Sequence, residues 1–139
     1  MLEKKIVVVG CGRLGASIAN DLYEQGEDII VIDKNEDSFR KLSDSFGGLT
    51  YVNEGTRVET YEQLELKKDD ILIVVTNDDN VNIMISQLVR KMFQIHTIIC
   101  RLYDPQRECV YQEFGIETIC PTYLSINRIE NILRGKRSA

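Results

Sequence analysis

The sequence predicts a single α/β domain with a doubly wound, six-stranded parallel sheet. Short runs rich in Val and Ile are apolar without alternating, which is typical of parallel strands that helices cover on both faces. These runs alternate along the chain with segments whose apolar residues recur with the period of an amphipathic helix. The 139 residues are enough for one domain with its own hydrophobic core.

Six segments are predicted as strands. The four strongest are continuous apolar runs, at residues 6–9, 29–32, 71–75 and 98–100. Weaker strands are predicted at residues 49–52 and 117–120. A helix is expected after each strand, and right-handed crossovers then put the switch point of the sheet between the strands that follow the first and third helices.

Apolar stripes mark three of the helices. The first stripe repeats every four residues, at Leu14, Ile18 and Leu22. Gly26 suits the end of that helix. The second stripe leaves Ile83 outside it and consists of Val81, Met84, Ile85, Leu88, Val89 and Met92. The last stripe consists of Ile126, Ile129, Ile132 and Leu133.

Capping residues predict where three helices begin. Thr56 followed by Glu59 fits a capping box. Asp104 directly before Pro105 fits an N-cap followed by a proline at the first helical position. Thr122 is predicted to cap the last helix. The polar composition at the end of the chain predicts one domain at residues 1–134 and a polar tail at residues 135–139.

The composition weighs against several classes of protein. Acidic residues outnumber basic ones by 22 to 17, for a net charge of -5, which disfavours nucleic-acid binding. The four cysteines form no C-x-x-C pair and there is one histidine, so no metal site is expected. We expect free thiols in a reducing cytosol. No leader opens the chain and no apolar run is long enough to span a membrane, so direct membrane insertion is not expected.

A glycine fingerprint lies between the first predicted strand and the first predicted helix. In G-C-G-R-L-G, Gly10 allows the tight turn, Gly12 leaves room for a pyrophosphate, and Gly15 lets the helix pack on the strand. The N-terminus of the helix then offers N–H groups and a partial positive charge to phosphates. This context indicates a Rossmann-like domain that binds an adenine nucleotide.

Asp33 completes the fingerprint. It ends the second predicted strand, 18 residues after Gly15, where a carboxylate accepts hydrogen bonds from ribose hydroxyls and repels a 2′-phosphate. NAD or a plain adenosine nucleotide is therefore favoured over NADP, although the neighbouring cation Lys34 can help to hold a 2′-phosphate. Arg13 inside the loop is either a phosphate ligand or a solvated side chain.

Several separated motifs resemble the TrkA-N domain family, which forms the N-terminal half of RCK domains. VVVGCGRLG at residues 7–15 and VIDK at residues 31–34 are typical of this family. VVTNDDNVN at residues 74–82 is similar too, and so is Arg101 at the end of the fifth strand. Arg101 is expected to point toward the crevice, the alternative being a side chain that extends from the sheet edge to solvent. Glu54 is a departure, because the family often has Asp there.

The resemblance implies a binding function. The nucleotide, NAD(H) or ATP, ADP or AMP, is expected to contact Gly10, Cys11, Gly12, Arg13, Leu14, Gly15, Asp33, Lys34, Glu54, Gly55, Thr76, Asn77, Asp78 and Arg101. The resemblance also implies a regulatory domain or subunit of a potassium channel or transporter, located at the cytoplasmic side of the membrane. It implies a homodimer or a higher ring, paired through surplus apolar helix faces, in which ligand-dependent assembly gates ion flux.

Two other functions are alternatives. A fragment of an NAD-dependent dehydrogenase needs a positioned acid or base, yet His96 precedes the fifth strand and no Tyr-x-x-x-Lys pair occurs. A nucleotide-linked redox sensor is the second alternative. It would rest on Cys11, whose thiol pKa a helix N-terminus can lower. The residues favour a sensor without enzymatic turnover, because a Rossmann-like fold alone does not establish catalysis.

Overall fold

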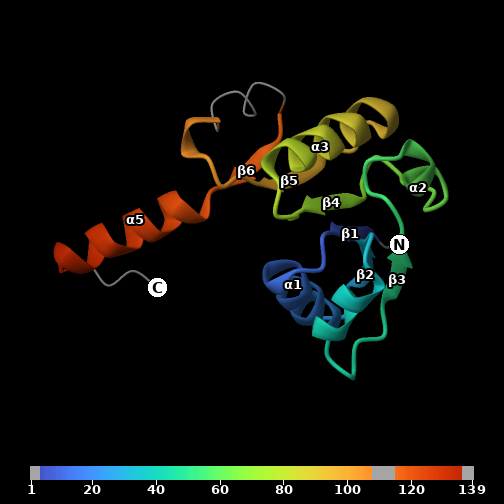
Figure 1. Cartoon of the computed structure of the whole chain (residues 1–139), viewed down its shortest axis with the longest axis horizontal. Helices are drawn as coiled ribbons and strands as arrows, with labels where there is room; N and C mark the ends of the chain where they lie inside the picture. Colours follow the sequence, from blue (N-terminus) through green and yellow to red (C-terminus); the bar gives the residue numbers. More distant parts are fainter. Residues whose placement is uncertain (1–3, 108–114, 136–139) are drawn as a thin grey trace.

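Six parallel strands form one sheet in the order β3-β2-β1-β4-β5-β6, which confirms the predicted doubly wound fold (Figure 1). The computed structural model describes residues 4–107 and 115–135. The strands are β1 (Lys5–Val9), β2 (Asp28–Asp33), β3 (Leu49–Val52), β4 (Ile71–Val74), β5 (Thr97–Arg101) and β6 (Glu117–Ile119). β2 and β4 pair with opposite sides of β1, so the switch point lies between them, as predicted.

Helices cover both faces of this sheet. The helices are α1 (Arg13–Glu24), α2 (Val58–Glu62), α3 (Asp79–Phe93) and α5 (Pro121–Leu133), with 3₁₀ helices η1 (Glu36–Lys41) and η2 (Pro105–Arg107). Figure 1 shows α1 on one face and α2 and α3 on the other. Neighbouring residues of β1 point to opposite faces, so Val7 and Val9 belong to the core under α3, and Ile6 and Val8 to the core under α1.

The connection between β2 and β3 differs from the predicted α-helix. It contains the short 3₁₀ helix η1, whose sequence EDSFRK has one large apolar side chain, Phe39. A single apolar residue makes no stripe that would hold a longer helix on the sheet. After β5 the described part of the helical segment is η2, and its predicted continuation at residues 108–114 lies outside the described residues, as do residues 136–139 of the polar tail.

Two of the predicted caps are wrong. α2 begins at Val58 without a side-chain cap, and the Thr56 hydroxyl donates to Glu54 Oε1 at 3.4 Å instead. α5 begins at Pro121, so Thr122 lies inside its first turn. The fixed φ of proline suits the first helical position and moves the start of the helix ahead of Thr122.

Two other predicted helix boundaries, at Asp104 and Gly26, are confirmed. Asp104 Oδ1 accepts a hydrogen bond from Gln106 N at 3.0 Å at the start of η2. Gly26 directly follows the C-cap of α1 with a φ of +90°, a conformation that glycine adopts without strain.

The buried face of α3 is rotated from the predicted stripe. Met84 and Met92, which were expected to face the sheet, are 49% and 55% exposed, whereas Ile83 packs against the core. The rotation has a polar cause, because Asn82 and Ser86 occupy the buried face beside the apolar residues of the helix. A rule that assigns polar residues to solvent therefore misplaces Met84 and Met92, although the rest of the stripe packs on the core as predicted.

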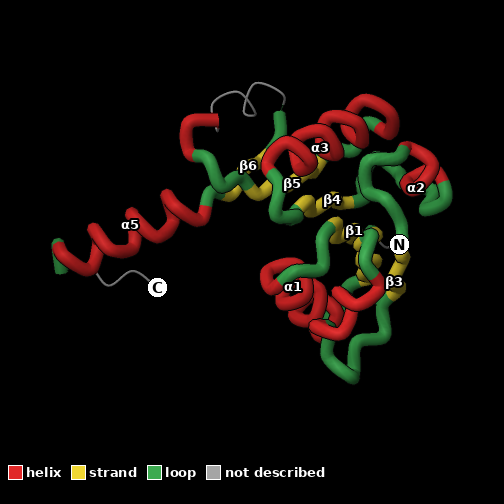
Figure 2. The backbone as a smooth tube through the Cα atoms, in the orientation of Figure 1, coloured by secondary structure: helices red, strands yellow, loops and turns green. Residues whose placement is uncertain are grey.

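α5 extends away from the sheet and packs on none of its faces (Figure 2). None of its residues is buried, and its predicted stripe is largely in solvent, with Ile129 56% and Leu133 79% exposed. Within the described ranges, no helix has the length and apolar character needed to cross a membrane.

Candidate functional site

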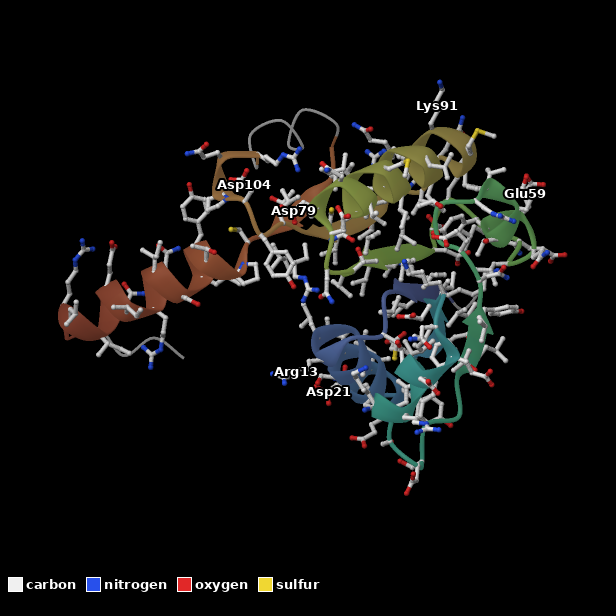
Figure 3. The ribbon with its side chains drawn as sticks, viewed as in Figure 1. Arg13, Asp21, Glu59, Asp79, Lys91 and Asp104 are labelled. Atoms are coloured by element: carbon white, nitrogen blue, oxygen red, sulfur yellow. The ribbon has the colours of Figure 1, made fainter. Side chains whose placement is uncertain are left out.

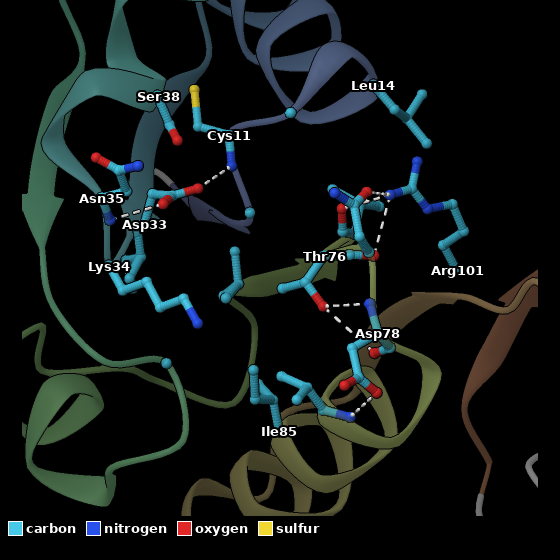
Figure 4. A pocket seen from close by; sticks show the side chains of 18 of the residues that line it. Cys11, Leu14, Asp33, Lys34, Asn35, Ser38, Thr76, Asp78, Ile85 and Arg101 are labelled. Carbon is cyan, nitrogen blue, oxygen red and sulfur yellow. Dashed lines mark hydrogen bonds between the residues drawn. The ribbon is translucent and has the colours of Figure 1, made fainter.

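A pocket of about 740 Å³ opens at the carboxyl ends of the strands, over the switch point. This size is within the usual range for small-ligand sites. Five connections line it: the glycine loop, the end of β2 with η1, the β3–α2 loop, the β4–α3 loop and the end of β5 (Figure 4). The pocket brings together every predicted site residue except Gly15, which lies behind the loop.

Each glycine of the loop meets a different structural requirement. Gly10 has a φ of +101°, and a Cβ there would lie 2.9 Å from Thr76 N. A Cβ on Gly15 would collide with Gly10 O, because the helix starts directly against the turn. At Gly12 a Cβ would meet nothing within 4 Å, so this part of the loop faces open space. Gly12 is also the N-cap of α1 and provides no capping side chain, which leaves the helix start suited to an anion.

Asp33 joins the end of β2 to the glycine loop. One carboxylate oxygen accepts from Cys11 N and the other from Asn35 N, each at 2.8 Å. Each oxygen keeps a further lone pair for a ligand hydroxyl. Lys34 points into the pocket beside Asp33 (Figure 4). Arg13 is exposed at the first position of α1, at the rim of the pocket (Figure 3).

The thiol of Cys11 is unsuited to redox sensing. Burial and the nearby Asp33 carboxylate raise its pKa to about 11, against the opposing effect of Lys41. The thiol is therefore protonated at neutral pH, and the thiolate is the form that reacts with oxidants. Cys11, Cys100 and Cys120 are buried free thiols, as expected, and Cys109 lies outside the described residues.

The β3–α2 loop forms the next wall of the pocket. The Tyr61 hydroxyl donates to Gly55 O at 2.6 Å, and the Thr60 hydroxyl donates to Glu54 O at 2.9 Å. A Cβ on Gly55 would lie 2.9 Å from Val9 Cγ1, so the loop sits tightly on β1. Burial, with the Glu54 charge, raises the pKa of Tyr61, which therefore stays a hydrogen-bond donor. These contacts hold Glu54 at the pocket wall.

Arg101 is buried at the opposite wall with 8% of its surface exposed, so the alternative of a solvated side chain is wrong. Its Nη2 donates to Val75 O at 2.8 Å, to Thr76 O at 3.0 Å and to Asn77 Oδ1 at 3.4 Å. Its Nε is buried without a partner. Among the ion pairs of the described residues none involves Arg101, so no carboxylate there pairs with its charge.

Sequence reasoning missed several residues that line the pocket, among them Ser38, Lys41 and Tyr103. Ser38 and Lys41 come from η1, and Tyr103 comes from the segment after β5. The Tyr103 ring centroid lies 4.8 Å from Arg101 Cζ, and its hydroxyl donates to Asn77 Oδ1 at 3.4 Å. The signal for Tyr103 was its position two residues after Arg101, which puts both on one side of an extended chain. Nothing local marked Ser38 and Lys41.

His96 lies far from this pocket along the sheet. It directly precedes β5, so it is at the amino end of a strand whose carboxyl end meets the pocket. Its Nδ1 lies 3.8 Å from Asp69 Oδ1 on the exposed surface. It therefore cannot act as acid or base on a ligand in the crevice.

Comparison with known proteins agrees with this geometry. The TrkA-N domain model matches residues 6–121. The Trk system potassium uptake protein TrkA of Streptomyces coelicolor is 38% identical over 82% of this chain and 51% of its own length. The chain thus spans about half the length of that curated relative.

The fold also occurs in solved structures. The NAD(P)-binding domain of an exopolyphosphatase-related protein from Archaeoglobus fulgidus has a TM-score of 0.81 at 18% identity, over 96% of this chain and 99% of the other. The Kef C-terminal domain of Shewanella denitrificans in its AMP-bound form has a TM-score of 0.76 at 18% identity, over 97% and 84%. From the family match and the architecture together, the chain belongs to the TrkA-N domain family.

Proposed function

We propose that this chain is a regulatory nucleotide-binding unit of a potassium uptake system, and that it binds NAD(H), ATP, ADP or AMP in the crevice over the switch point. The observation that carries the proposal is the buried Arg101 guanidinium, which lines the same pocket as the glycine loop and Asp33, forms no ion pair with a described carboxylate and leaves its Nε without a partner. A buried cation without a carboxylate favours an anionic ligand, because an unpaired charge in a poorly hydrated site is costly.

Each wall then has a part in recognition. Asp33 accepts hydrogen bonds from the ribose hydroxyls, and Glu54 accepts from the adenine side of the ligand. The N–H groups of the glycine loop and of the start of α1 bind the first phosphates. Arg101, and Arg13 at the rim, bind the charge of the phosphate chain. Leu14, Gly55, Thr76, Asn77 and Asp78 complete the contact surface.

The proposed role is binding without turnover. The relatives are potassium uptake proteins. His96 lies at the amino end of β5, too far from the crevice to act as an acid or base on a ligand there. Regulation then requires that the nucleotide bind two arrangements of the assembly with different affinity. A fragment of a dehydrogenase is the alternative that would replace this proposal.

Two copies of the chain are proposed to pair through the exposed stripe of α5. Its side chains form an apolar surface with no cover in the described chain: Leu124, Ile126, Ile129, Ile132 and Leu133. Water disfavours such a surface, and a second copy supplies an equivalent one. A membrane subunit of the transporter is the further proposed partner, with the domain at residues 1–134 on the cytoplasmic side of the membrane and residues 135–139 as its polar tail.

Calorimetric titration of ligand-free protein with NAD, NADH, ATP, ADP and AMP tests the proposal. At least one of the five is expected to bind in the micromolar range, with no consumption of NADH in the presence of simple hydroxy acids or carbonyl compounds. If none of the five binds, the crevice is not a nucleotide site. Steady turnover of NADH would instead identify a dehydrogenase.

A further inference from the structure

Asn82 of α3 is fully buried, and its side-chain amide joins the segments that line the crevice. On the oxygen side, Oδ1 accepts from Thr76 N at 3.0 Å and from the Thr76 hydroxyl. On the nitrogen side, Nδ2 donates to Thr76 O at 3.1 Å and to Arg101 O at 3.0 Å. These contacts use both donors and both acceptor positions of the side chain. A buried amide is tolerated in a core only when it is satisfied in this way.

The partners of Asn82 connect three walls of the pocket. Thr76 is the residue against which the turn at Gly10 rests, since a Cβ on Gly10 would lie 2.9 Å from Thr76 N. The Thr76 carbonyl also accepts from Arg101 Nη2 at 3.0 Å. Asn82 itself does not line the pocket. One side chain of α3 thus fixes the spacing between the glycine loop, the β4–α3 loop and the end of β5.

We infer that Asn82 is the positioning residue for the phosphate end of the ligand site, acting through Thr76 and Arg101. The inference rests on the proposed function, because it assigns a role in nucleotide binding. Its consequence is a division within the pocket. The adenosine end depends on Asp33 and Glu54, which are held by contacts of their own. The phosphate end depends on the amide of Asn82.

Asn82→Asp is the most informative variant because it keeps the size of the side chain. It replaces the Nδ2 donor by a carboxylate oxygen that faces the carbonyl oxygens of Thr76 and Arg101. Acceptors then face acceptors, and the new charge also competes with phosphate for the Arg101 guanidinium. The ratio of ADP affinity to AMP affinity is therefore expected to fall by at least about fivefold. AMP, which is held mainly at its adenosine end, should lose less.

Ser86→Ala is the matched control. Ser86 lies one turn further along α3, is equally buried, and its hydroxyl donates to the main-chain oxygen of Asn82 at 2.7 Å. The control removes a buried hydrogen bond of the same helix without touching Thr76 or the Arg101 carbonyl. Its expected result is lower thermal stability with an unchanged ADP-to-AMP ratio.

The titrations use the full chain well below the unfolding midpoint of each variant, which circular dichroism defines. If Asn82→Asp does not fold, Asn82→Ser, whose hydroxyl retains part of the contact set, takes its place. A selective loss of ADP affinity in the Asn82 variant alone supports the inference. Parallel losses of ADP and AMP, unchanged affinities, or an equal shift in Ser86→Ala overturn it. A wild-type chain that binds neither ADP nor AMP, nor any other of the five nucleotides, overturns the proposed function instead.

Discussion

Replacing Asp33 by Asn tests two roles of one carboxylate. The carboxylate accepts from Cys11 N and Asn35 N, each at 2.8 Å. An amide of the same shape can accept only one of these bonds and presents an N–H₂ group to the other donor. A hydrogen bond to a charged group contributes about 1.5–3 kcal/mol, and the open pocket favours the lower end. The free energy of unfolding of the ligand-free variant should therefore fall by about 1–2 kcal/mol.

The same substitution changes which nucleotide binds. Losing the charge-assisted bonds to the ribose should weaken NAD by about 1.5 kcal/mol, which is roughly tenfold. In the wild type, NADP should bind at least about tenfold more weakly than NAD, because Asp33 faces the 2′-phosphate. In Asp33→Asn that difference should narrow, since Lys34 and Lys41 line the same part of the pocket. Calorimetric titration with both dinucleotides measures all four affinities.

Asp37→Asn is the control for this experiment. Asp37 lies four residues away in η1, and its side chain is 78% exposed in a loose pair with Arg40 at 3.8 Å. Exposed pairs of this kind contribute little. Stability and both affinities should stay within about 0.5 kcal/mol of wild type. An Asp33→Asn variant that binds NAD as tightly as wild type, or a wild type that binds NADP equally well, would refute the reasoning.

Three further predictions follow from separate features. Arg13→Ala should weaken the binding of ATP more than that of AMP in calorimetric titration, because the additional charge of ATP lies at its far phosphates. Equal losses of affinity for both nucleotides would show that Arg13 is a solvated side chain with no role in binding phosphate. Sedimentation at micromolar concentration should show a dimer that Ile129→Glu dissociates, and a strict monomer of the wild type would remove the role of α5. In the folded chain the pKa of Cys11 is raised to about 11, so as pH rises from 9 toward 11 the thiol ionises in the unfolded chain first. The free energy of unfolding should therefore fall over this range, and Cys11→Ala should lessen that fall in alkaline denaturation curves.

The sheet and the glycine loop were predictable because their signals are local. A continuous run of β-branched residues reports burial on both faces, and a glycine turn between strand and helix needs no distant contact. Strand starts and ends consequently agree to within one residue at β1 and β2. The caps at Thr56 and Thr122 failed because competing local geometry, a hydroxyl bound to Glu54 and a proline at the first helical position, decided the helix starts.

The parts that escaped prediction depend on contacts between distant segments. Ser38 and Lys41 line the pocket because η1 folds back over the end of β2, and nothing in EDSFRK signals that path. Asn82 reads as a polar residue on the solvent side of a helix until Thr76 and Arg101 are placed beside it. Its burial then rotates α3 and exposes Met84. A polar network in a core is thus invisible to a hydrophobic pattern.

The placement of the glycine loop directly after β1 has a consequence for local unfolding. β1 is the strand that pairs on both sides at the switch point, and its residues Val7 and Val8 are fully buried in the two opposite cores. Amide hydrogens of such a strand exchange only through near-global opening, whereas short edge elements such as η1 open at much lower free energy. Amide hydrogen exchange should therefore be slow in β1, beneath the crevice, and rapid in η1, at its side. A bound nucleotide would slow exchange chiefly in η1. The fraction of molecules in which η1 is locally unfolded therefore sets part of the apparent affinity for the ligand.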